Sequence, residues 1–311
     1  MTTDEKLAAI LAAVQTDPGN RGLARDPHDN LFTATKGDFE AACRSIAEHR
    51  QPELGIVTGF FIPTATPAAY ETDGPLGAAF LARALEPLGV VWLFLIEETG
   101  RRIFKHAGIP PHDRGANSVR IPPATFSDDQ LVASPTGLRV LPFTHLIALE
   151  RVGPGLDARC RNMRGVDITD RTEPADRLFR LYPQIDPAIR TIGIGDGGNE
   201  IGMGKIPHET IVKNIPNGDL IHCRVPTDHL IVAGVSNWGA YALAAGVYVL
   251  REVKPPADLF DPNRERQILE VMVREGPLVD GVTGQQTATV DGLTWDEYAK
   301  PLVRIRAILE S

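Results

Sequence analysis

Short apolar runs alternate along the chain with longer segments in which apolar residues recur at helical spacing. The apolar runs, which are too short for helices and are typical of buried strands, are 54–59, 90–97, 145–150, 191–195, 220–225 and 229–234. The helical patterns cover 4–14, 38–49, 75–89, 173–182, the segment that begins at Ser236, 262–275 and 295–309. Asp38 and Ser236 are the expected N-caps of their helices. This alternation predicts an α/β fold: a mostly parallel sheet with helices on both faces, in a Rossmann-like three-layer arrangement.

No linker or internal repeat divides the chain, so residues 1–311 are expected to form a single α/β domain. Residues 107–142 are rich in proline and show little periodicity, which predicts an irregular excursion from the sheet.

Composition narrows the class of partner. The formal net charge is −8 and like charges do not cluster in long blocks, which argues against nucleic acid or an anionic membrane as a partner. No apolar stretch approaches the ~18 residues of a membrane span, and the N-terminal MTTDEKLAAILAAV does not resemble a signal peptide. The three cysteines lack CxxC spacing and are typical of reduced thiols. We therefore expect a cytoplasmic protein that acts on a small molecule; homo-oligomer formation stays open.

Polar, glycine-rich turns follow several of the predicted strands. These turns are ETDG (71–74), Glu150 and Arg151 leading to NMRG (162–165), DGGNE (196–200) and SNW (236–238). Asp, Asn and Gly are what any tight turn uses, so DGG alone would indicate only a turn. Because the carboxyl ends of parallel strands meet at one edge of the sheet, the turns together predict a crevice lined by acids, amides, arginines and helix N-termini.

Gly193, Gly195 and Gly198 spell GxGxxG after a strand, which raises a nucleotide-dependent enzyme as an alternative. Asp196 and Glu200 count against it, because both would repel a pyrophosphate. A non-enzymatic amino-acid-binding protein is a second alternative, since the same crevice would hold a carboxylate without turnover.

Longer blocks of sequence carry a resemblance to a known family. GIGDGGNEIGMGK followed by HLIVAGVSNWGAYAL, with TGFFIP and ETDGPLGA upstream and ERVG and NMRG between them, resembles the D-glutamate cyclase family over about residues 20–250. The resemblance implies a lyase that converts D-glutamate to 5-oxo-D-proline and water, or runs the reverse hydrolysis. It also implies that the following residues belong to the site: Asp73, Glu150, Arg164, Asp196, Asn199, Glu200 and Asn237. One segment departs from the family: PGLDARCR (154–161) replaces a GRAADG-like stretch, so the substrate could differ.

The residues suggest roles for this chemistry, which must deprotonate an ammonium group and neutralise a γ-carboxylate. Asp196 or Glu200 is the candidate base, and Asp73 or Glu150 the candidate proton donor. The substrate-binding candidates are Thr72, Arg151, Arg164, Gly197, Gly198, Asn199, Ser236 and Asn237, with the helix start at Ser236 expected to hold the α-carboxylate. No cofactor is required. If a metal binds, Asp73, Asp196 and Glu200 suit Mg²⁺ or Mn²⁺ better than Zn²⁺, because no His/Cys set has ligand spacing.

Overall fold

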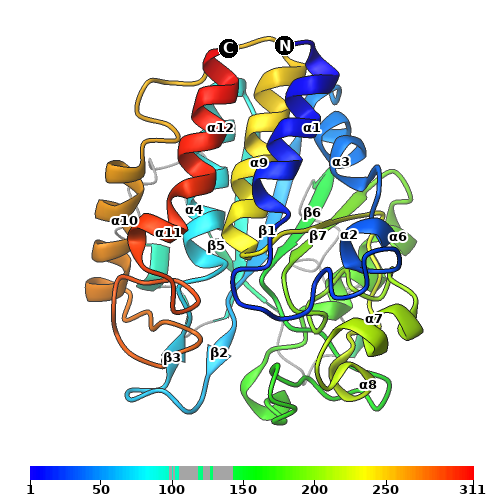
Figure 1. The fold of residues 1–311 in the computed structure, drawn as a ribbon. Coiled ribbons are helices and arrows are strands. Elements are labelled where there is room, and N and C mark those ends of the chain that lie inside the picture. The colour runs from blue at the N-terminus through cyan, green and yellow to red at the C-terminus, as the bar shows by residue number, and fades with distance from the viewer. Residues whose placement is uncertain (98–99, 101, 105–117, 122–126, 129–142) are drawn as a thin grey trace.

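The computed structural model describes residues 1–97, 100, 102–104, 118–121, 127–128 and 143–311. Most of the proline-rich segment 107–142 lies outside these residues, so its predicted irregularity is not tested. Figure 1 shows α1 (Thr3–Val14), α9 (Ser236–Leu250) and α12 (Lys300–Glu310) side by side in front of the sheet, with both chain ends at the same end of the molecule.

One sheet of the described residues holds six strands, all paired in parallel. They are β1 (Glu53–Thr58), β4 (Val91–Ile96), β5 (Ser118–Arg120), β6 (His145–Leu149), β7 (Arg190–Gly195) and β8 (His229–Val232), in the order β5-β4-β1-β6-β7-β8. The chain runs outward from β1 to β5 and then returns to the other side of β1 at β6. This is the strand order of a doubly wound Rossmann sheet, whose ligand site is expected where the order reverses, between β1 and β6.

Helices cover both faces of the sheet because side chains alternate along each strand. Ile56 of β1 belongs to one core cluster and its neighbour Val57 to the other. The helices of the first face are α1, α3 (Asp38–Ala47), α4 (Pro75–Leu85), α9, α10 (Pro262–Glu275), α11 (Trp295–Tyr298) and α12. Those of the second are α2 (Leu31–Ala34), α6 (Asp176–Ile185), α7 (His208–Asn214) and α8 (Gly218–Ile221). The predicted α/β fold with three layers is confirmed.

A short antiparallel hairpin, β2 (Phe61–Ile62) and β3 (Ala69–Tyr70), follows β1 at the lower end of the molecule in Figure 1. It returns the chain to Glu71 and to the start of α4. Among the described residues, no helix combines the length and the apolar character that a bilayer span needs.

Three local predictions are wrong. The predicted strand 220–225 is instead the end of α8 and an extended stretch whose N–H groups, at Cys223 and Arg224, donate to loop carbonyls rather than to a strand. Gly37, with a φ of 90°, is the N-cap of α3, and the Asp38 carboxylate accepts the N–H of Leu230. The N-cap of α9 is Val235, so Ser236 is the first residue of that helix.

Candidate active site

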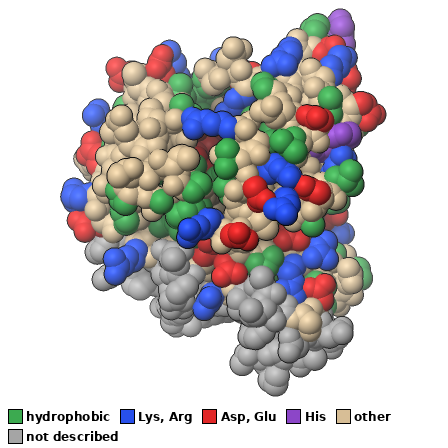
Figure 2. All heavy atoms as spheres, turned by 90° about the horizontal axis from the view of Figure 1, so that it is seen from below, with side chains coloured by type: hydrophobic (Ala, Val, Ile, Leu, Met, Phe, Trp, Pro, Cys, Tyr) green, Lys and Arg blue, Asp and Glu red, His purple; other side chains and the backbone are tan. Residues whose placement is uncertain are grey.

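A cleft of about 150 Å³ opens at the carboxyl ends of the central strands, beside the point where the strand order reverses. Figure 2 views the molecule from this end, where acidic and basic side chains lie next to one another. The volume of the cleft suits a molecule of amino-acid size better than a drug-sized ligand, which needs about 300 Å³ or more. The lining residues are Arg21, Phe60, Ile62, Thr64, Glu71, Glu150, Asn162, Met163, Arg164, Asp196, Asn199, Glu200, Gly281, Val282 and Asp291.

The loop after β7 is shaped by Glu200. One carboxylate oxygen of Glu200 accepts the N–H of Asp196 at 2.9 Å, and the other accepts the N–H of Gly198 at 2.7 Å. Gly198 has a φ of 105°, a conformation that a side chain would strain. The glycines therefore let the chain turn back on the Glu200 carboxylate, and this turn presents Asp196 to the cleft.

Asp196 pairs with Arg21, one of the two arginines that line the described part of the cleft. Its Oδ1 forms an ion pair with Arg21, which also contacts Asp291 at 2.8 Å. The Arg21 loop is held by Asp17, whose carboxylate accepts the N–H of Arg21 at 2.8 Å. Asp196 Oδ2 is buried and accepts no hydrogen bond from an N–H or hydroxyl group of the described residues, but the carboxyl groups of Asp196 and Asp291 hydrogen-bond to each other when one of them holds a proton. Asp196 thus has one oxygen paired with a cation and a second, buried oxygen next to another carboxyl group.

Asp73 and Asn237 cap each other's helices. The Asp73 carboxylate accepts the N–H groups of Ser236 and Asn237, at 2.9 and 2.8 Å, at the start of α9. The Asn237 side-chain oxygen accepts the N–H groups of Gly74 and Gly77, at 2.9 and 2.7 Å, at the start of α4. These contacts occupy two N–H groups at each helix start, and those of Ser236 and Asn237 are therefore not available to a substrate carboxylate.

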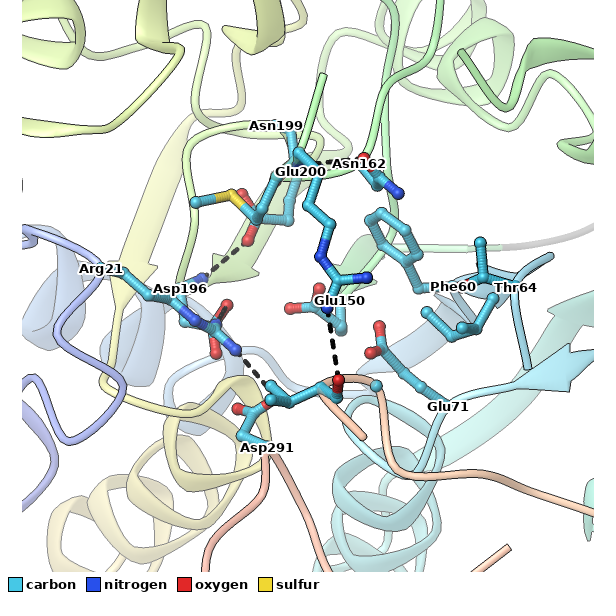
Figure 3. Close-up of a pocket in the computed structure, with 15 residues that line it drawn as sticks. Arg21, Phe60, Thr64, Glu71, Glu150, Asn162, Asp196, Asn199, Glu200 and Asp291 are labelled. Carbon is cyan, nitrogen blue, oxygen red and sulfur yellow. Dashed lines mark hydrogen bonds and ion pairs between the residues drawn. The ribbon is translucent and has the colours of Figure 1, made fainter. Parts of the chain in front are cut away.

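Glu150 follows β6 at the centre of the cleft in Figure 3 and has a φ of 44°. The Ser236 hydroxyl donates a hydrogen bond to its carboxylate. Figure 3 also shows Glu71 and Asp196 directed toward the same space from other sides. The site is therefore a group of acids that converge from three separate segments of the chain.

Burial raises the pKa of these acids. Removal from water, and then the nearby carboxylates, raise the pKa of Glu71 and Glu150 well above the ordinary value. Burial and Asp291 raise the pKa of Asp73 to about 7. Burial also raises the pKa of Asp196, while Arg21 opposes that rise. The acids outnumber the nearby cations, so the cluster must bind protons or a metal ion.

The oxygen atoms fit a hard divalent cation. Two groups of acids each bring one oxygen per residue within 4.8 Å of the others. They are Asp73, Asp196 and Asp291, and Glu150, Asp196 and Glu200. All-oxygen ligands suit Mg²⁺ or Mn²⁺. The set expected from the sequence (Asp73, Asp196 and Glu200) is divided between these groups, which share Asp196.

The other sequence-predicted residues fall into two classes. Asn199 and Arg164 line the cleft; Asn199 donates to the Arg161 carbonyl at 2.7 Å, and Arg164 donates to the Val282 carbonyl at 3.3 Å. The remaining candidates do not line it: Thr72, Arg151, Gly197, Gly198, Ser236 and Asn237.

Arg151 has a different place from the predicted one. It is buried, and its guanidinium contacts Glu97 and donates to the Gly59 and Glu173 carbonyls. Thr72 donates to the Thr289 carbonyl at 2.7 Å. Both residues therefore hold loops around the cleft instead of facing a ligand.

Sequence reasoning missed Arg21 and Asp291, and it left Glu71 without a role. Asp291 stands before a glycine and looks like an ordinary turn residue. Arg21 lies in a loop after α1 with no motif around it. Of these three residues, only Glu71 could have been recognised as a site candidate from the sequence, because the turn that starts α4 does not need a glutamate at that position.

The GxGxxG match lacks the context that a dinucleotide site requires. After β7 the chain forms bends and turns over 196–207, and the next helix, α7, begins at His208. The pyrophosphate of a dinucleotide needs a helix N-terminus directly after the glycines. The structure therefore disfavours the nucleotide-dependent alternative.

Comparisons with known proteins show the family of the chain. A family model described as "D-glutamate cyclase-like, C-terminal" matches residues 10–306. The human protein named "D-glutamate cyclase, mitochondrial" is 32% identical over 256 residues, which are 80% of this chain and 40% of the relative. The chain thus spans well under two thirds of that relative. Because the family model covers nearly the whole chain, the protein belongs to the D-glutamate cyclase-like family.

Proposed function

We propose that this protein is a lyase that cyclises D-glutamate to 5-oxo-D-proline with loss of water, or catalyses the reverse hydrolysis. Family membership and the name of the human relative support the reaction. The observation that carries the proposal is the amino-acid-sized cleft in which Asp196, paired with Arg21, stands among acids of raised pKa. Such a site supplies both a base and an acid near neutral pH.

Arg164 is the proposed ligand of a substrate carboxylate. It lines the cleft, is exposed, and has no carboxylate partner among the described residues. Within the described part of the chain, its guanidinium donates a hydrogen bond to the Val282 carbonyl alone, at 3.3 Å. An arginine fork grips a carboxylate at two points, which fixes its orientation. Asn162 and Asn199 add amide groups on the same side of the cleft.

Asp196 is the proposed base. Its ion pair with Arg21 favours the ionised form and opposes the rise in pKa that burial causes, and its second oxygen accepts no N–H or hydroxyl hydrogen bond among the described residues. It takes a proton from the substrate ammonium, and the resulting amine attacks the γ-carboxyl carbon. Holding the substrate folded, with these atoms close, supplies a further part of the acceleration. Glu200, whose two oxygens accept backbone N–H groups, positions Asp196.

A divalent cation is compatible with this scheme. The two acid groups that share Asp196 would hold Mg²⁺ or Mn²⁺, which would help neutralise the γ-carboxylate. Cytoplasmic location and homo-oligomer formation stay predictions.

The direct test is to incubate the purified protein with D-glutamate or L-glutamate, with and without EDTA, and to measure 5-oxoproline by chiral chromatography. We expect product from the D-form. Asp196→Asn should make none, whereas Asp170→Asn, a change at an exposed aspartate outside the cleft, should match the wild type. Loss of product in EDTA that Mg²⁺ or Mn²⁺ restores would establish the metal. Binding of D-glutamate without any product would favour a non-enzymatic amino-acid-binding protein.

A further inference from the structure

The cleft has one apolar wall among its charged ones. Four apolar side chains line it beside the acids, arginines and amides: Phe60, Ile62, Met163 and Val282. Val282 is exposed, and Ile62 and Met163 are half-buried, whereas Phe60 is 5% exposed. Phe60 is also the one aromatic residue among the described lining residues. The buried apolar surface that a small ligand meets in this cleft therefore belongs chiefly to Phe60.

The position of Phe60 is fixed from in front and from behind. The carbonyl of Gly59 accepts a hydrogen bond from Arg151 at 2.9 Å, and the carbonyl of Phe60 accepts the N–H of Glu71 at 3.0 Å. The side chain belongs to a small core cluster whose other buried members are Val152, Cys160 and Ile168. Because buried side chains are closely packed, the ring cannot retreat from the cleft without disturbing this cluster.

A glutamate molecule folded for ring closure has a polar part and an apolar part. Its ammonium group and two carboxylates need charged partners, whereas its two methylene groups need an apolar surface. Figure 3 shows Arg21 and Asp196 on one side of the cleft and Phe60 on the other. Methylene groups are therefore best accommodated on the side of Phe60, with the charged groups of the substrate turned toward the arginines and acids.

We propose that Phe60 determines the chain length of the substrate: its ring packs against the two methylene groups of D-glutamate and excludes a third. This inference rests on the proposed cyclisation and names a selectivity of that same site. D-2-aminoadipate, which has one more methylene group, would place that group in the volume of the ring. A position fixed on both sides, as that of Phe60 is, gives such a limit its sharpness.

The excluded reaction would have the same chemistry as the accepted one. The amine of D-2-aminoadipate would attack its δ-carboxyl carbon, so that a C–N bond forms and a C–O bond breaks. Two protons of the ammonium group would leave with the departing oxygen as water. The product would be a six-membered lactam in place of 5-oxo-D-proline.

The test compares kcat/KM for D-glutamate with kcat/KM for D-2-aminoadipate in the wild type, Phe60→Ala and Phe60→Leu. Any intrinsic difference in reactivity between the two amino acids cancels when this ratio is compared between proteins. A single methylene group in a fitted pocket is worth about 10-fold to 200-fold in kcat/KM. We therefore expect the preference for D-glutamate to fall by about 10-fold or more in Phe60→Ala, and by less in Phe60→Leu.

Phe61→Leu is the matched control for Phe60→Leu. Phe61 is the next residue and is half-buried, but its ring contacts Tyr70 edge-on, with centroids 5.6 Å apart, and it is not among the described lining residues. The ratio of the two kcat/KM values should be the same in Phe61→Leu as in the wild type.

A second measurement does not depend on turnover. Calorimetry gives the dissociation constants of 5-oxo-D-proline and of the six-membered lactam. The wild type should bind the five-membered lactam more tightly, and the difference should narrow in Phe60→Ala.

Equal binding of the two lactams by the wild type would overturn the role of Phe60. So would a folded Phe60→Ala variant that loses rate on both amino acids without a change in their ratio, because that result indicates a structural role alone. If Phe60→Ala does not fold, an unchanged ratio in Phe60→Leu overturns it. A wild type that makes no 5-oxoproline would overturn the proposed function instead, and a lactam preference that depends on Phe60 would still support the size limit.

Discussion

At the scale of single residues, Arg21 sets the charge state of the site. Its guanidinium bridges Asp196 and Asp291, and its charge opposes, without cancelling, the rise that burial causes in the pKa of Asp196. Arg21→Met should therefore raise the pKa of Asp196 and shift the acid limb of the kcat/KM profile to higher pH, because the base must be ionised. Arg25→Met, at an exposed arginine of the same loop, is the control. An unchanged acid limb in Arg21→Met would show that Arg21 does not tune the base.

Asp196 and Glu200 have different roles, although they are close in sequence. Glu200→Gln keeps one acceptor oxygen but places its NH₂ group against the other backbone N–H, and should reduce the unfolding free energy by about 1–3 kcal/mol as well as the rate. Asp196→Asn removes the proposed base and should abolish turnover, and because the Asp196 carboxyl group accepts no backbone hydrogen bond, the loss of stability should be smaller. Urea unfolding and initial rates of both variants separate these outcomes. Equal losses of stability would contradict the division of roles.

The sequence indicated most of the acids of the site but not their contacts. Asp196 and Glu150 stand directly after strands and Glu200 lies in the turn that follows Asp196, so their places at the carboxyl edge could be predicted. Whether Glu200 points at a ligand or back at its own loop depends on the turn geometry, which DGGNE alone does not determine. The same limit applies to Asp73, whose capping of a helix distant in sequence is a tertiary contact.

At the scale of elements, α4 and α9 depend on each other through their N-termini. Asn237→Ala should leave the N–H group of Gly77 without an acceptor and that of Gly74 with the Asp73 carboxylate alone, and so reduce the unfolding free energy by about 1–2 kcal/mol. Asp73→Ala should do the same to α9. Because the two caps belong to one network, their effects should not add in the double variant. Additive losses in urea unfolding would mean that the caps act independently.

Strands were predictable where an apolar run lies in the middle of the sheet, as at 145–150 and 191–195. Such runs are buried on both faces and carry no polar alternation. The run 220–225 has similar composition, and Ile221, Cys223 and Val225 are indeed buried. Burial alone does not make a strand. The backbone N–H groups of Cys223 and Arg224 donate to loop carbonyls instead of to a neighbouring strand, and no local sequence pattern reveals which partner they take.

At the scale of the whole molecule, the acid cluster links stability to pH. The folded-state pKa values of Glu71, Glu150 and Asp73 are raised above those of the unfolded chain. The stability that these groups contribute is therefore present at low pH. It is lost as the pH rises through the folded-state pKa values, of which that of Asp73 is about 7. The unfolding free energy should therefore fall between about pH 5 and about 8. Urea unfolding across that range checks this, and Glu71→Gln should reduce the fall. A rise in stability with pH would contradict the raised pKa values.

The complete site comes from parts of the chain that are distant in sequence. Arg21 comes from the loop after α1, and Asp291 from the segment before α11. Neither residue follows a strand of the sheet, so the rule that locates sites at strand ends does not find them. They reach the cleft only because α1 and α12 pack on α9 and bring both ends of the chain to one face of the sheet.

The central claim is that D-glutamate cyclises in this cleft, with Asp196 as the base. The most direct measurement uses D-glutamate with both γ-carboxyl oxygens labelled with ¹⁸O, in unlabelled water, and follows 5-oxoproline by mass spectrometry. Our account predicts rapid formation of 5-oxo-D-proline that retains one label with the wild-type protein, and only the uncatalysed background with Asp196→Asn. Product from Asp196→Asn at the wild-type rate, or no product above background from the wild-type protein, would contradict it.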